Sequence, residues 1–191
     1  VCNALTAAIA ERFPKASTEL EKAWTTTVRR MAVVKLTSRG QTVCVVSLHC
    51  SKSEGTAELL GALKDVLEDA VGPFANVIVG LDSNVPGNEA REFQSKLLEM
   101  GMEFGGSQEA QQVTVAKMRT MFRTQVKKAG EMDVSHKDYV LTWGLGQRQA
   151  TAYTPDLRTP FGIDRNEKAM RLPTTSWPFD HAAVMAKVSL G

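Results

Sequence analysis

The sequence predicts an α/β fold in which helices cover a mixed or antiparallel sheet. Two β-rich runs, Met31–Leu36 and Gln41–Leu48, flank small polar residues and a glycine that are typical of a hairpin turn. In Thr56–Val71 leucine and valine recur every three or four residues, which indicates an amphipathic helix. Asn76–Leu81 is a further apolar run, so a strand-helix-strand step follows the hairpin. The combination favours a sheet that is not purely parallel.

Two helices are predicted before the hairpin. Ala4–Arg12 contains good helix formers, and Pro14 prevents the helix from continuing. A second, short helix is predicted for Thr18–Trp24, with Thr18 as its cap and Glu21 at the capping-box position. Both helices would precede the first strand and pack beside the sheet.

The remaining elements follow from shorter patterns. The segment 43–48 is apolar nearly throughout, as expected of a central strand covered on both faces. We then expect a helix over Glu89–Met100, a break over Gly101–Gly106, a basic stretch over Thr114–Lys128 that is helical or extended, and strands over Tyr139–Trp143 and Ala182–Leu190.

The composition indicates a single globular domain over residues 1–191. With 43% hydrophobic and 23% charged residues, the chain is unlike disordered or fibrous proteins. Its longest uncharged apolar stretch, Val43–Leu48, is far shorter than the roughly 20 residues that cross a bilayer, so no membrane span is predicted. Three cysteines without a CxxC pair argue against a disulfide scaffold, and an intracellular, reducing compartment is expected. Because the net charge is only +2, a nucleic-acid partner would need a local basic patch.

Polar residues stand where three apolar runs begin or end. His49 follows the second strand of the hairpin, Asp82 and Asn84 follow the next strand, and Asp180 and His181 precede the last one. Each alone is more typical of a cap, a turn or a solvated residue than of a functional site. Since strand ends meet at one rim of a sheet, we expect the five side chains to converge there.

Four short motifs, taken in order, resemble the signatures of the endonuclease/exonuclease/phosphatase family. They are Leu48-His49, Val79-Gly80-Leu81-Asp82-Ser83-Asn84, Asp138-Tyr139-Val140-Leu141 and Phe179-Asp180-His181-Ala182-Ala183-Val184. The resemblance is clearest from Thr25 to the C-terminus and is strongest toward the poly(A)-exoribonuclease branch. It implies a two-sheet mixed sandwich flanked by helices, incomplete on its N-terminal side, and an activity that cleaves phosphate esters.

The resemblance also implies roles for individual residues. His49 matches the histidine that contacts the scissile phosphate, and Asp82 matches the general base. Asn84 matches the residue that orients the phosphate or the nucleophile. His181 matches the second catalytic imidazole, and Asp138 matches the carboxylate that orients it. Such groups suit the reaction, because a water that attacks an anionic phosphodiester needs a base and the developing charge needs donors.

A metal ion is implied in the same way. Asp180 matches a metal-site carboxylate, and the expected cofactor is Mg²⁺ or Mn²⁺. The family's first-strand Asn and upstream metal-binding Glu have no counterpart, and no leader pattern follows Val1, so we expect further sequence upstream. This chain alone should then bind Mg²⁺ weakly and hydrolyse slowly. The extra Leu81 and the bulky Phe179 also depart from the family motifs and lower the expected efficiency.

Basic residues are concentrated between positions 117 and 128, where they are Lys117, Arg119, Arg123, Lys127 and Lys128. A solvated protein face would show the same pattern. Beside a phosphate-ester site, such a stretch can instead bind a polynucleotide backbone. Its Arg-Thr and Gln-x-x-Lys elements resemble the segment before the Asp-Tyr strand in the poly(A)-exoribonuclease branch, so RNA is favoured over DNA as the partner.

Three functions are therefore open. The first is a metal-dependent RNA nuclease. The second is a catalytically degenerate family member that acts as a binding or assembly subunit in a protein complex. The third is a phosphoesterase that acts on inositol phosphates or sphingolipids.

Overall fold

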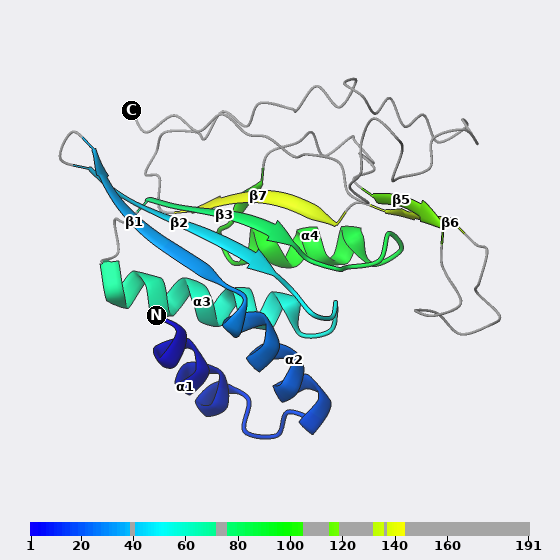
Figure 1. Ribbon diagram of the computed structural model, residues 1–191, viewed down its shortest axis with the longest axis horizontal. Helices are drawn as coiled ribbons and strands as arrows, with labels where there is room; N and C mark the ends of the chain where they lie inside the picture. The colour runs from blue at the N-terminus through cyan, green and yellow to red at the C-terminus, as the bar shows by residue number, and fades with distance from the viewer. Residues whose placement is uncertain (39–40, 72–75, 105–114, 119–131, 136, 144–191) are drawn as a thin grey trace.

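The computed structural model describes residues 1–38, 41–71, 76–104, 115–118, 132–135 and 137–143 (Figure 1). Its elements are, in chain order, α1 (Cys2–Arg12), α2 (Thr18–Arg29), β1 (Ala32–Ser38), β2 (Gln41–His49), α3 (Thr56–Val71), β3 (Asn76–Asp82), α4 (Ala90–Glu99), β4 (Glu103–Phe104), β5 (Val115–Met118), β6 (Met132–Ser135) and β7 (Asp138–Trp143). The predicted α/β class, with a mixed sheet flanked by helices, is confirmed.

Within the described residues, the main sheet has five strands in the order β1-β2-β3-β7-β4. β2 and β3 run parallel, whereas β1 with β2, β3 with β7 and β4 with β7 are antiparallel pairs. β2 and β3 can run parallel because α3, which connects them, brings the chain back to the end of the sheet where β2 begins. β5 and β6 form a separate antiparallel pair.

The hydrophobic core lies between the sheet and its helices. α3 and α4 lie along one face of the sheet, and α1 and α2 lie beyond α3 (Figure 1). Leu60 and Leu63 of α3 have an exposed fraction of 0%, as do Val77 and Val79 of β3. Full burial of such a side chain contributes about 1.5–3 kcal/mol, so these side chains stabilise the packing of the helices on the sheet.

The α2 helix is longer than predicted and its cap is different. The Ser17 hydroxyl accepts the cap hydrogen bond from Leu20 N at 3.2 Å, one residue earlier than the expected Thr18 cap. The helix continues to Arg29 because Trp24 and Val28, one turn apart, are both buried against the rest of the core. Burial of this face extends the helix beyond the point where the local sequence signal ends.

Most of the other predicted elements are present. β2 is an interior strand, but its second face is only partly covered, since Val45 is half-buried and Ser47 is exposed. β4 lies inside the region predicted as a break, and β6 was not predicted. The basic stretch begins as the extended strand β5, and the rest of it lies outside the described residues, as does the predicted strand over Ala182–Leu190. Across the described part of the chain, none of the helices is long and apolar enough to cross a membrane.

Candidate active site at the sheet rim

Three polar residues form a row across the adjacent strands β2, β3 and β7. His49 is the last residue of β2 and Asp82 is the last residue of β3, and the parallel register places them opposite each other. Asp138 is the first residue of β7, and the antiparallel register places it opposite Asp82. Residues paired across neighbouring strands project from the same face of a sheet, so all three side chains point out from the same face. We call this end of the sheet the rim, defined by His49, Asp82 and Asp138.

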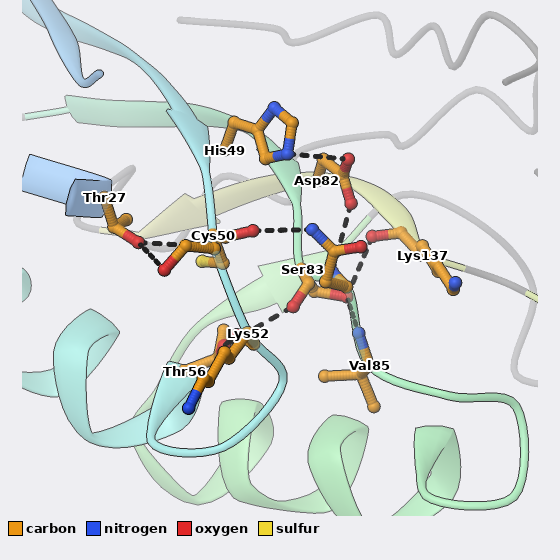
Figure 2. Close-up of polar contacts among 11 residues, drawn as sticks. Thr27, His49, Cys50, Lys52, Thr56, Asp82, Ser83, Val85 and Lys137 are labelled. Carbon is orange, nitrogen blue, oxygen red and sulfur yellow. Dashed lines mark hydrogen bonds and ion pairs between the residues drawn. The ribbon is translucent and has the colours of Figure 1, made fainter. Parts of the chain in front are cut away.

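His49 and Asp82 are close enough to interact electrostatically. His49 Nε2 lies 3.6 Å from Asp82 Oδ2 (Figure 2), which is an ion-pair distance when the imidazole is protonated and is too long for a good hydrogen bond. The imidazole is 55% exposed, whereas the carboxylate is 17% exposed. The histidine is therefore accessible to a ligand, and the carboxylate lies deeper beside it.

The Asp82 carboxylate is oriented by the turn that follows it. Asn84 N donates to Asp82 Oδ1 at 3.0 Å, and Asn84 has a left-handed backbone with φ of 53°. Asparagine tolerates this conformation better than most residues, and an aspartate that accepts from the residue two positions on is a common turn. The sequence Asp82-Ser83-Asn84 thus fixes one oxygen of the carboxylate and leaves the other facing His49.

The Asn84 side chain links the ends of two strands. Asn84 Nδ2 donates to the Cys50 carbonyl at 2.5 Å, and Cys50 N donates to the Asp82 carbonyl at 2.9 Å. These bonds continue the β2–β3 pairing past the last residues of both strands. The predicted contact between Asn84 and a phosphate stays a prediction, and the amide nitrogen already contacts the protein.

Residues that follow β2 are fixed by α2. Ser51 N donates to Thr27 Oγ1 at 3.0 Å, and Ser51 Oγ donates to the Ala23 carbonyl at 2.8 Å. Thr27 has an exposed fraction of only 2%, so this link is shielded from water. The sequence alone did not indicate it, because the partners lie 24 and 28 residues apart.

Asp138 is positioned by the buried residue that follows it. Tyr139 is 2% exposed, and its ring meets Phe93 of α4 and Phe104 of β4 edge-on, at centroid distances of 5.6 and 6.1 Å. Burial raises the pKa of Tyr139 to about 12, so its phenol stays protonated at neutral pH. The aromatic cluster anchors the start of β7 and therefore the backbone of Asp138 at the rim.

Cys50 lies at the site but does not have a reactive thiol. It is 2% exposed, and burial raises the pKa of its thiol to about 12, with the Asp82 charge acting in the same direction. The thiolate is the nucleophilic form, so Cys50 is unreactive at neutral pH. Its backbone groups bond to Asp82 and Asn84, which makes its contribution structural.

The rim supplies carboxylate oxygens, the ligand type that Mg²⁺ prefers, from Asp82 and Asp138. No group of three or more His, Cys, Asp or Glu side chains that could bind an ion occurs among the described residues. Asp180 and His181 lie outside those residues, so their predicted approach to the rim stays a prediction.

Of the predicted nucleic-acid-binding residues, Lys117 lies in β5, where its Cα is opposite that of Asp133 in β6. The other four lie outside the described residues and are Arg119, Arg123, Lys127 and Lys128. The structure therefore defines the backbone at the start of the basic stretch and leaves the proposed RNA contacts as predictions.

Comparisons with known proteins give partial structural likenesses. No protein-family model matches the sequence, and no curated protein sequence matches it. An endonuclease/exonuclease/phosphatase family protein from Leptotrichia buccalis resembles the chain with 14% identity and a TM-score of 0.39, over 59% of this chain and 40% of that one. D. rerio TDP2, complexed with a single-strand DNA product, resembles it with 16% identity and a TM-score of 0.38, over 59% and 46%.

The chain thus spans less than half the length of either solved protein. Because both TM-scores are below 0.5, neither protein's activity is transferred to this chain.

Proposed function

We propose that this chain contains the phosphate-binding rim of a metal-dependent phosphodiesterase whose substrate is RNA. The observation that supports the proposal most is the row formed by His49, Asp82 and Asp138 on one face of three adjacent strands. It combines an accessible imidazole with an oriented, partly buried carboxylate, at 3.6 Å from each other. A base and a donor side by side on rigid strands suit attack of water on an anionic ester.

In the proposed reaction, Asp82 takes a proton from the attacking water while the water oxygen forms a bond to phosphorus. The ester P–O bond breaks, and the leaving oxygen receives a proton from a general acid. We propose His181 for this role, since the resemblance matches it to a catalytic imidazole. His49 donates a hydrogen bond to a non-bridging phosphate oxygen and stabilises the negative charge that develops there. The bond from Asn84 N to Asp82 Oδ1 keeps the base in one orientation throughout.

Magnesium or manganese would reduce the negative charge on the phosphate when bound. Asp180 is the residue we propose as its carboxylate ligand, and the rim carboxylates are chemically suited to such a hard cation. Asp138 is proposed to orient His181, as a carboxylate that accepts from one ring nitrogen fixes the tautomer of the imidazole.

The proposal of RNA rests on the basic stretch from Lys117 to Lys128. Lys and Arg at this density neutralise phosphates along a backbone and release counterions, so binding should weaken as salt rises. The alternative is a non-catalytic binding subunit, because the family's first-strand Asn and upstream metal-binding Glu have no counterpart in the sequence. In that case the basic stretch would bind RNA and the rim would not cleave it.

A substrate panel distinguishes these functions. The protein, with any natural sequence that precedes Val1, is incubated with Mg²⁺ and labelled oligo(A) RNA, oligo(dA), an inositol polyphosphate or sphingomyelin. We expect RNA to be cleaved fastest, and cleavage to stop when EDTA removes the metal. Salt-dependent RNA binding without cleavage would favour the binding subunit. If only the inositol polyphosphate or sphingomyelin is hydrolysed, that compound and not RNA is the substrate.

A further inference from the structure

Ser83 stands between the two residues Asp82 and Asn84 at the end of β3, and its side chain is completely enclosed. Its exposed fraction is 0%. Ser83 Oγ donates to the Lys137 carbonyl at 2.8 Å, and Ser83 N donates to the same carbonyl at 2.8 Å. The carbonyl oxygen has two lone pairs, so both bonds can form together.

These two bonds extend the pairing of β3 with β7. The last pair of that ladder is Asp82 opposite Asp138, and Ser83 and Lys137 are the next residues outward. A strand pair that ended at Asp82 and Asp138 would fray at that point, because terminal residues have few partners. The Ser83 bonds close the ladder one step beyond the two carboxylates and so fix the separation of their backbones.

Two more hydrogen bonds involve the same residue. Val85 N donates to Ser83 Oγ at 3.2 Å (Figure 2). The Thr56 hydroxyl shares its single proton between the Lys52 carbonyl at 2.9 Å and the Ser83 carbonyl at 3.4 Å. The Ser83 hydroxyl thus uses both its donor and an acceptor lone pair. Ser83 therefore joins β3, the start of β7, the turn after β3 and the first residue of α3.

We infer that Ser83 is a positioning residue for the reaction at the rim. The inference depends on the proposed phosphodiesterase function. Ser83 does not contact the substrate, because its hydroxyl is enclosed by protein. It holds the backbones of Asp82 and Asp138 at a fixed spacing, and the rim residues act on the phosphate. A base displaced by about 1 Å loses about 100-fold in rate, so loss of this clamp acts on kcat more than on KM.

The test compares Ser83→Ala with Ser83→Thr, which keeps the hydroxyl, and with Val77→Ala as the matched control. Val77 is fully buried in the same strand but opposite Trp143, at the far end from the rim. Steady-state hydrolysis of bis(p-nitrophenyl) phosphate with Mg²⁺ gives kcat and KM, and amide hydrogen exchange reports Val85 N–H. Circular dichroism gives the folded fraction of each variant, to which kcat is normalised.

Ser83→Ala is expected to lower kcat about 10-fold to 100-fold with little change in KM and to speed exchange at Val85. Ser83→Thr should recover much of the lost kcat, and Val77→Ala should lose stability while keeping kcat per folded molecule. If Ser83→Thr is unfolded, Ser83→Cys, with a weaker donor of similar size, should have a kcat between those of Ser83→Ala and the unmodified protein.

An unchanged kcat in Ser83→Ala, with rapid exchange at Val85, would overturn the positioning role and leave the proposed function intact. An equal fall of kcat in Val77→Ala would also overturn it, because general destabilisation would then explain the loss. If the unmodified protein does not hydrolyse the phosphodiester at all, the proposed function fails first, and the positioning role fails with it.

Discussion

Replacing Asp82 by Asn is expected to lower kcat for RNA cleavage by about 100-fold to 10,000-fold, the usual contribution of a general base. The amide has the same shape and keeps an oxygen that can accept from Asn84 N, so the turn should survive. It cannot take a proton from the attacking water, and KM should change much less than kcat. Single-turnover cleavage of labelled oligo(A) with saturating Mg²⁺ measures the chemical step directly.

Asp69→Asn is the matched control for this prediction. Asp69 is an exposed carboxylate of α3, near the end of the helix that lies away from the rim. Its replacement removes one negative charge at the surface, as Asp82→Asn does at the rim, and should leave kcat unchanged. Full activity in Asp82→Asn would exclude this carboxylate as the base.

Gly55→Ala is expected to lower the free energy of unfolding by about 2–4 kcal/mol. Gly55 has φ of 72°, where an L side chain costs about 1–2 kcal/mol. A Cβ there would lie 2.6 Å from Leu20 Cδ1 and 2.8 Å from Trp24 Nε1, and overpacking of this kind costs about 1–3 kcal/mol. Trp24 Nε1 also donates to the Gly55 carbonyl at 3.0 Å, so the ring cannot move away without losing that bond. Urea denaturation measures the change.

Alanine substitutions at two other glycines distinguish the cost of backbone strain from the cost of a steric clash. Gly101 has φ of 70°, and a Cβ added there would meet no atom within 4 Å, so Gly101→Ala should cost only the strain, about 1–2 kcal/mol. Gly61 lies inside α3, where an added Cβ would lie 3.2 Å from the flexible Met100 Sδ, and Gly61→Ala should change stability by less than about 1 kcal/mol. If Gly55→Ala costs no more than Gly101→Ala, the packing of α2 on Gly55 is looser than described.

Local patterns predicted the elements that have strong periodicity. The α3 helix has the predicted bounds, because its leucine spacing gives one continuous buried face. The full length of α2 could not be predicted, since Val28 continues the helix only through burial against residues distant in sequence. β4 and β6 are short strands of two and four residues that exist through pairing with β7 and β5.

The candidate site was predictable where it depends on strand ends. His49 and Asp82 directly follow predicted strands, and in the structure they are the last residues of two parallel strands whose register places them opposite each other. The sequence predicts that the last described strand begins at Tyr139, whereas Asp138 is already the first residue of β7 and lies opposite Asp82. The clamp at Ser83 joins residues 54 positions apart, so a pattern along the chain does not reveal it.

Locating a bound phosphate tests the central claim most directly. A crystal structure of the protein with Ca²⁺ and phosphorothioate-linked oligo(A), chosen to slow cleavage, would show where the backbone of the substrate lies. The rim account predicts a phosphate oxygen within about 3.2 Å of His49 Nε2, with its phosphorus above the end of the sheet formed by Asp82 and Asp138. A substrate bound elsewhere on the protein, without contact to His49 or Asp82, would contradict it.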